Sequence, residues 1–257
     1  MNRAKPTIGI PRQLVVGADG LHSAVRSVVF GPQENFERYL GYYAASFIAS
    51  GYPKRNEHTY LSYAAPGRQI SRYGLRDDRT AFLFVFESRH PLPAMTHDMT
   101  GQKQLLCQTF SRDPWDEWPE IEGRLTACED LYFDAVSQIV LPCWSQGRVA
   151  LVGDAAYCPS LLAGEGAAFA MAGAYILARE LERAPGDYAQ AFANYERRFR
   201  PFMEGKQKSA RAFASSFAPK SPLGLFLRDQ VLRLSAIPAV GDWIMRRIVT
   251  DSFVLPY

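Results

Sequence analysis

The chain has 257 residues, a formal net charge of +3 and 47% hydrophobic residues. This length suits one large domain or two smaller ones, and the composition is that of an ordinary soluble globular protein. The basic residues are scattered apart from Arg197-Arg198 and Arg246-Arg247, so no stripe suited to nucleic acid is expected.

The first 35 residues predict one strand and one helix. Residues 1–13 indicate an extended segment. A short buried strand follows at 14–16 and ends in the sequence GADG at 17–20. The next stretch, 21–29, predicts a helix with Ser23 near its N-terminus, and Gly31-Pro32 ends it.

Residues 36–140 predict a β-rich domain. Four strands are expected, at 39–49, 59–65, 69–74 and 80–86, as an antiparallel meander with one face over a ligand. A loop over 91–97 and helices over 101–110 and 115–128 follow. Asp113 is expected to cap the second helix, with Pro114 at its first position. A strand over 131–141 completes this domain.

Residues 141–185 predict a strand, a turn and a long helix, and 186–257 a helical region. The apolar run 149–152 ends in Gly153-Asp154, and a helix rich in alanine starts at Gly166 and ends before Pro185-Gly186. A further helix over 188–198 is expected to begin at Asp187, with Pro201 kinking or interrupting it. Helices separated by Pro219, Pro222 and Pro238 follow.

Asp154 is the first candidate binding residue. Open α/β sheets bind ligands beyond the carboxyl ends of their strands, and a carboxylate there can hold sugar-like hydroxyls. The alternative is that Asp154 only caps the turn. Position alone supports both interpretations equally.

The segment Gly164-Glu165-Gly166 is the second candidate. Glycines let the backbone approach a flat ligand, and the start of the helix offers unpaired N–H groups, here those of Ala167 and Ala168. The alternative is a tight connection that needs a positive φ.

The third candidate comprises Asp19, Gly20 and Arg26. Asp19 could organise the turn, and Arg26 could face phosphates or a carboxylate. A turn followed by a solvated arginine is the simpler alternative.

Other chemistries find little support. No GxSxG segment is present, and the acidic pairs resemble surface residues. The four histidines form no metal-ligand pattern, so no metal is expected. The cysteines lack CxxC spacing, which favours a reduced, cytoplasmic setting. The longest apolar run, 167–178, is shorter than the ~20 residues of a membrane span, and no signal peptide is expected.

Two segments together carry a family resemblance. GADGLHSAVR at 17–26 and GRVALVGDAA at 147–156, the latter followed by a Pro/Gly loop and a helix, resemble the flavoprotein monooxygenases of the para-hydroxybenzoate hydroxylase type and their TetX-like relatives. The resemblance extends from Leu14 to the final Leu255-Pro256-Tyr257.

The resemblance implies a mixed α/β fold: an incomplete, Rossmann-like FAD-binding domain, an antiparallel substrate domain and C-terminal helices. It also implies roles for individual residues. Gly153 and Asp154 would hold the ribityl chain of FAD, and the amides of Ala167 and Ala168 would face the flavin N1–C2=O edge. The remaining cofactor contacts would come from Pro159, Leu161, Gly164, Glu165 and Gly166 beside the isoalloxazine, and from Asp19, Gly20 and Arg26 near the diphosphate and the NAD(P)H approach.

The implied reaction is reduction of FAD by NAD(P)H, followed by use of O2 to hydroxylate an aromatic or polycyclic small molecule. The flavin supplies this chemistry, so no protein residue is assigned as catalytic acid or base. The strands between 37 and 87 would form the substrate sheet.

Three features depart from the family pattern. Members begin with a βαβ unit that carries GxGxxG and binds the ADP part of FAD, whereas only 13 residues precede Leu14 here. Apolar sheet edges should therefore be exposed, and the chain alone should bind FAD weakly. In addition, Leu161 replaces a proline and Tyr157 a histidine.

Two interpretations follow from these departures. In one, the chain is a fragment of a monooxygenase, completed by upstream sequence or by another polypeptide that supplies the βαβ unit. In the other, it is a non-catalytic remnant that acts as a small-molecule-binding or interaction module.

Overall fold

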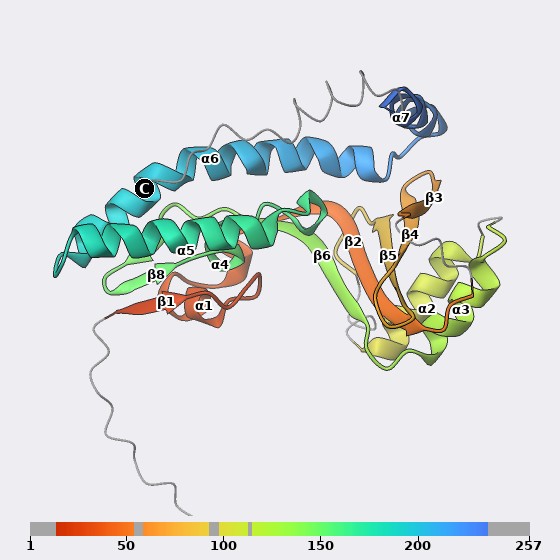
Figure 1. Cartoon of the computed structure of the whole chain (residues 1–257), viewed down its shortest axis with the longest axis horizontal. Helices are drawn as coiled ribbons and strands as arrows, with labels where there is room; N and C mark the ends of the chain where they lie inside the picture. The colour runs from red at the N-terminus through yellow and green to blue at the C-terminus, as the bar shows by residue number, and fades with distance from the viewer. Residues whose placement is uncertain (1–13, 54–58, 93–97, 113–114, 236–257) are drawn as a thin grey trace, which may run out of the picture. The chain divides into compact units, whose positions relative to one another are not determined.

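The computed structural model describes residues 14–53, 59–92, 98–112 and 115–235 (Figure 1). The extended segment expected at 1–13, the cap at Asp113-Pro114, Pro238 and the C-terminal tripeptide lie outside these residues. The described residues divide into two compact units, with 14–38 and 137–208 in unit 1 and those between 39 and 136 together with 209–235 in unit 2. Each unit is described by itself.

Unit 1 contains a small three-stranded sheet in the order β1-β8-β7. Strand β1 (Val15–Gly17) pairs in parallel with β8 (Val149–Leu151), and β7 (Ser145–Gln146) pairs antiparallel with the other edge of β8. After β1 comes helix α1 (Ala24–Val29), where the Ser23 side chain accepts a hydrogen bond from the Arg26 amide. A short 3-10 helix, η1 (Gln33–Asn35), follows. The expected strand and helix are both present, but the expectation of a buried strand is wrong, because Val15 and Val16 are exposed.

Helices cover this sheet in unit 1. They are α4 (Asp154–Tyr157), the 3-10 helix η3 (Leu161–Ala163), α5 (Gly166–Arg183) and the first part of α6 (Tyr188–Phe217). Residues Phe169, Gly173, Ile176 and Leu177 of α5 are buried at helical spacing, which gives the helix one core-facing stripe. The core beneath contains aromatic side chains that pack together, namely Trp144, Tyr157, Tyr195 and Phe199.

Unit 2 is built on a five-stranded sheet in the order β3-β4-β5-β2-β6. Its strands are β2 (Glu37–Ser50), β3 (Leu61–Ala65), β4 (Arg68–Gly74), β5 (Arg79–Glu87) and β6 (Tyr132–Ile139). The pairs β3–β4, β4–β5 and β2–β5 are antiparallel. The strands and the single sheet are confirmed, but the simple meander order is wrong, because β2 pairs with β5 and not with β3.

Helices α2 (Met99–Phe110) and α3 (Trp118–Ala127) pack on one face of this sheet. Alternate residues of β5, namely Phe82, Phe84 and Phe86, point into that core. Helix α7 (Pro222–Ser235) belongs to the same unit, and Arg228 on it donates to Gln69 of β4 at 2.9 Å.

Two helix boundaries differ from those expected. Helix α3 begins at Trp118 rather than Trp115, with Glu117 at the N-cap and Pro119 in its first turn. Helix α6 is 30 residues long and continues through Pro201, so of the two expected outcomes, a kink or an interruption, the interruption is wrong. Phe199 and Met203, on either side of Pro201, are fully packed in the core, and this packing compensates for the hydrogen bond that the proline lacks.

The mixed α/β class is confirmed. No helix within the described residues is both long enough and apolar enough to cross a membrane.

Candidate functional site

The two segments singled out in the sequence leave the small sheet at the same edge. Gly17 of β1 is opposite Leu151 of β8 in parallel register, and the Val152 amide donates to the Gly17 carbonyl at 2.9 Å. Asp19 and Asp154 follow these strand ends by two and three residues. The carboxyl ends of parallel strands are where open α/β sheets bind ligands. The two turns therefore converge on one edge of unit 1.

Asp154 does not cap either neighbouring helix. It lies in the first turn of α4, which has no side-chain cap, and α5, whose N-cap residue is Glu165, has none either. The residue is half-buried, and burial raises the pKa of Asp154 while a hydrogen bond with Cys158 partly opposes this shift. The preceding Gly153 has a φ of 63°, and a Cβ there would lie 3.0 Å from Ala170. Asp154 therefore caps neither helix, and its role in binding stays a prediction.

The start of α5 lies beside this carboxylate. A Cβ on Gly166 would lie 3.7 Å from Asp154 Oδ1, an ordinary contact distance, so neither strain nor collision requires glycine there. The first bond within the helix runs from the Phe169 amide to the Glu165 carbonyl at 3.1 Å. The amides of Gly166, Ala167 and Ala168 precede it, and both alanine side chains are exposed. Three amide donors and one carboxylate thus occupy adjacent positions.

The loop between α4 and α5 has an unusual backbone. Ser160 has a φ of 138° although it is not glycine, and its hydroxyl accepts from the Leu162 amide at 3.2 Å. Gly164 has a φ of 72°, which is the positive φ that the tight-connection alternative requires. Leu161 is 47% exposed, and Glu165 forms an ion pair with Lys206 at 3.1 Å. The loop thus exposes one apolar side chain while its backbone is tightly constrained.

Asp19 organises its own turn. Its carboxylate accepts from Ser23 Oγ at 2.5 Å and from the Val25 amide at 3.0 Å, so it holds the start of α1. Burial tends to raise the pKa of Asp19, but these hydrogen bonds outweigh it, and the pKa lies below its ordinary value. Gly20, which follows Asp19 in the turn, has a φ of 81°. This is the turn-forming role expected of Asp19.

Arg26 is fully buried and pairs with the protein itself. Its guanidinium donates to the carbonyls of Ala155 at 3.0 Å and Leu21 at 2.6 Å, and to Gln33 Oε1 at 2.9 Å. Because Ala155 follows Asp154, Arg26 ties the first turn to the second. A solvated arginine is wrong, and a direct contact of Arg26 with phosphate stays a prediction that these partners do not favour.

Two buried glutamines of unit 1 were not predicted from the sequence. Gln138 Nε2 donates to the carbonyl of Pro159, and Gln207 Nε2 donates to the carbonyl of Cys158. Both therefore hold the segment that follows α4. A single glutamine in a strand or helix has no spacing pattern that would have revealed this role.

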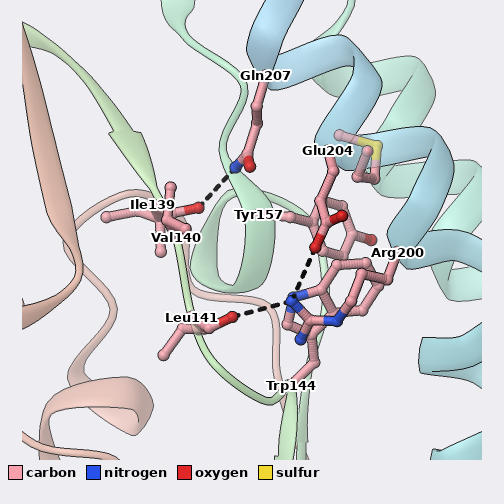
Figure 2. Close-up of a pocket in the computed structure, with 9 residues that line it drawn as sticks. Ile139, Val140, Leu141, Trp144, Tyr157, Arg200, Glu204 and Gln207 are labelled. Atoms are coloured by element: carbon pink, nitrogen blue, oxygen red, sulfur yellow. Dashed lines mark hydrogen bonds and ion pairs between the residues drawn. The ribbon is translucent and has the colours of Figure 1, made fainter.

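A small cavity of about 20 Å³ lies nearby in unit 1, lined by residues that include Leu141, Trp144, Arg200 and Gln207 (Figure 2). This is room for about one water molecule and far too little for a flavin ring. The candidate site is therefore the sheet edge with the start of α5, and not this cavity. In the part of the chain that the structure describes, no cluster of three or more His, Cys, Asp or Glu could hold a metal ion.

Comparison with known proteins agrees with this geometry. The family model of the FAD binding domain matches residues 5–204. A flavin-dependent monooxygenase from an unknown prokaryotic organism is 39% identical over 245 residues, which are 95% of this chain and 61% of that protein. Another from Legionella longbeachae serogroup 1 (strain NSW150) is 39% identical over 218 residues, 84% of this chain and 55% of that protein.

Solved structures of related enzymes are also similar to this chain. Tetracycline destructase Tet(51) matches with a TM-score of 0.78 and 32% identity over 95% of this chain and 62% of its own. Klebsiella pneumoniae HpxO, complexed with FAD and uric acid, matches with a TM-score of 0.68 and 25% identity over 91% of this chain and 58% of its own.

The chain belongs to the FAD binding domain family. It spans 55 to 61% of the length of these two curated relatives.

Proposed function

We propose that this chain forms the flavin-contacting and substrate-binding parts of an FAD-dependent monooxygenase. The observation that carries the proposal is the convergence of Asp154 with the start of α5 at the carboxyl end of β8. A half-buried carboxylate that caps neither helix is suited to hydroxyl groups such as those of a ribityl chain. The residues present therefore fit the cofactor that the family binds.

The start of α5 supplies the complementary charge. The amides of Gly166, Ala167 and Ala168 carry the partial positive charge of a helix N-terminus, and exposed alanine side chains leave them accessible. Such donors stabilise the negative charge that a flavin gains at its N1–C2=O edge when it is reduced. Pro159, Leu161, Gly164 and Glu165 would lie beside the ring. When bound, the flavin supplies the oxygen chemistry, and the protein orients it and excludes water.

In this proposal Asp19 and Gly20 lie near the diphosphate, and Arg26 supports them from below. The contact between Arg26 and the Ala155 carbonyl fixes the spacing of the two turns. NAD(P)H is proposed as the reductant and O2 as the oxidant; the relatives named flavin-dependent monooxygenases support a monooxygenase reaction. No residue of the chain is proposed to act as acid or base.

The five-stranded sheet of unit 2 is proposed to bind an aromatic or polycyclic substrate. Gln69, Ser71 and Tyr73 alternate with residues that face α2 and α3, so they lie on the opposite face, where Gln69 and Ser71 are buried and Tyr73 is exposed. Tyr60 and Tyr73 stack there at 6.0 Å between ring centroids, and both are exposed. Stackable rings beside hydroxyl and amide groups suit a flat, oxygen-rich molecule. Uric acid bound to HpxO and the naming of a tetracycline destructase support this class.

We further propose that a βαβ segment docks on the outer edge of β1. Val15 and Val16 point to opposite faces of the sheet and are 38% and 45% exposed, whereas parallel strands are normally covered on both faces. Among the described strands, β1 pairs only with β8. The proposed occupant is the nucleotide-binding βαβ segment that the family resemblance implies, supplied by the whole protein or by a partner polypeptide. The curated relatives extend beyond the matched region, which is compatible with such a segment.

The proposal also bears on the location of the protein and on the non-catalytic alternative. Cys107, Cys128, Cys143 and Cys158 are all unpaired thiols, which supports the proposal of a cytoplasmic location. A purely non-catalytic module is not favoured, because both flavin-contacting turns and the start of α5 are intact.

The direct test is spectroscopic. The full-length protein that contains this chain should purify with bound FAD and should consume NAD(P)H and O2 in equal amounts when a polycyclic phenol is added. A full-length protein that binds no flavin under any condition would contradict the proposal.

A further inference from the structure

We propose that Gln138 and Gln207 are positioning residues. Together they hold the loop between α4 and α5, residues 158–165, in its constrained conformation. This inference rests on the proposed function for its relevance to FAD, but the loop contacts themselves can be tested without the cofactor. The pair is called the glutamine clamp below.

The clamp fixes two successive carbonyl groups. Gln138, at the end of β6, donates through Nε2 to the Pro159 carbonyl at 2.7 Å. Gln207, on α6, donates through Nε2 to the Cys158 carbonyl at 3.3 Å. It also donates to the Ile139 carbonyl at 2.7 Å (Figure 2). Side chains from two elements that are far apart in sequence therefore meet on adjacent residues of one segment.

The two glutamines also bind each other. Gln138 Nε2 donates to the Gln207 backbone carbonyl at 2.7 Å, so both of its amide hydrogens point at carbonyl oxygens. This arrangement fixes the orientation of the amide, since exchanging its oxygen and nitrogen would place three acceptors together. Both side chains are buried, at 0% and 7% exposure. Water therefore competes little for these hydrogen bonds, which makes the clamp rigid.

The clamp lies directly before the most strained residue of the loop. Ser160 has a φ of 138° and a ψ of 145°, a region that is normally reserved for glycine, and it is buried. Such conformations persist only where the surrounding structure determines them fully. On one side of Ser160 the carbonyls of Cys158 and Pro159 are pinned, and on the other side its own hydroxyl accepts from the Leu162 amide. The clamp is what holds the N-terminal side.

Gln138 has one side-chain acceptor that makes no hydrogen bond within the described residues. This acceptor, Oε1, is buried. A residue that served packing alone would gain from an apolar side chain here, because an unpaired buried acceptor is destabilising. The Nε2 group of Gln138 donates to the Pro159 carbonyl and to the Gln207 carbonyl, and these two bonds account for an amide side chain at this position.

The consequence is local. Without the clamp, Ser160 can relax to an ordinary φ, and the loop that leads to Gly164 and the start of α5 becomes heterogeneous. The residues proposed to touch FAD are unchanged, but they are no longer held in one arrangement before the cofactor binds. Binding then carries the cost of ordering them.

Hydrogen exchange of the 257-residue chain, followed by mass spectrometry, tests the clamp. Gln138→Met and Gln207→Met retain side-chain length and remove the donors. We expect amides in 160–166 to exchange about tenfold faster in either variant, with peptides of β8 and the C-terminal half of α5 unchanged.

Two control variants separate this effect from a general loss of stability. Gln69→Met removes a buried, hydrogen-bonded glutamine of unit 2, and Gln190→Met removes an exposed one on α6. Neither should change exchange in 160–166. Unchanged loop exchange in both clamp variants would overturn the proposal. Unfolding of the whole chain in both, judged by circular dichroism, would overturn it too, because the glutamines would then serve the core and not the loop.

The link to the cofactor is tested in the full-length protein. There the clamp variants should raise the Kd for FAD about tenfold relative to the parent. A parent that binds no FAD would contradict the proposed function and leave the exchange result standing. Faster loop exchange together with an unchanged Kd in a parent that binds FAD would overturn the role in positioning the cofactor.

Discussion

Gly17 of β1 is paired with Leu151 of β8 in parallel register, so the chain leaves both strands at one edge of the sheet. The turn at Asp19 and the turn at Asp154 are separated by more than half of the sequence, and this single pairing brings them together. Arg26 strengthens the relationship through its bond to the Ala155 carbonyl. The first prediction concerns that arginine.

Arg26→Leu should lower the free energy of unfolding by about 3 kcal/mol, because it leaves the buried Ala155 carbonyl and two partly buried acceptors, the Leu21 carbonyl and Gln33 Oε1, without their donor. Urea denaturation followed by circular dichroism measures this. Arg89→Leu is the control, since its side chain is 87% exposed and its loss should cost less than ~0.5 kcal/mol. Equal stability of the two variants would show that the buried guanidinium does not join the turns.

Asp19→Asn should lower stability at neutral pH by about 1 kcal/mol through loss of charge at the start of α1. The pKa of Asp19 is lower in the folded state, so its contribution is present above the unfolded pKa, about 3.9, and is lost as the pH falls through the folded value. The difference between variant and parent should therefore shrink below about pH 4.

Stability measured across that pH range checks the Asp19 prediction. Asp229→Asn, an exposed partner of Arg228, serves as the control and should show a small difference throughout. A difference between Asp19→Asn and the parent that grows as the pH falls would have the wrong sign for a carboxylate of lowered pKa.

Gly173→Ala should destabilise unit 1 by about 2 kcal/mol through overpacking. The added Cβ would collide with the Tyr157 hydroxyl and lie 3.1 Å from Phe199. Tyr157→Phe removes that hydroxyl, so the double variant should recover part of the loss. Gly123→Ala in α3 meets nothing within 4 Å and should instead stabilise the chain by ~0.5–1 kcal/mol. Thermal unfolding of the four variants decides, and a double variant no better than Gly173→Ala would contradict the collision.

The 257-residue chain by itself should hold FAD weakly, because the proposed diphosphate and adenosine contacts belong to the segment that docks on β1. Adding that segment from a relative should restore binding, followed by the visible absorbance of flavin. Val16→Lys should prevent this recovery by charging the strand edge, whereas Leu223→Lys on exposed α7 should not. Stoichiometric flavin in the chain alone at micromolar concentration would contradict this prediction.

The sequence predicted the strands that precede Asp19 and Asp154, because each is a short apolar run that ends in a glycine turn. From the paired motifs it also predicted that the two turns lie close together and contact the same cofactor; the first part agrees with the pairing of β1 and β8, and the second stays a prediction. It did not predict that β2 pairs with β5, since sheet order depends on contacts between distant segments. Pro201 was misjudged for a similar reason: local propensity favours a break, and the packing of Phe199 and Met203 overrides it.

The roles of Arg26 and of the glutamine clamp were also outside what the sequence could show. A basic residue after a turn is usually solvated, and only the fold reveals that the Ala155 carbonyl lies within its reach. Gln138 and Gln207 belong to no pattern, because their function depends on two carbonyls brought near them by tertiary structure.

The most direct test of the central claim is the Kd for FAD of the full-length protein with Asp154→Ala. Loss of a charge-assisted hydrogen bond from a half-buried site should raise the Kd by about 10- to 100-fold. Asp187→Ala, which removes the cap of α6 in the same unit, controls for a loss of stability. An Asp154→Ala protein that retains FAD as tightly as its parent would show that this carboxylate does not hold the cofactor.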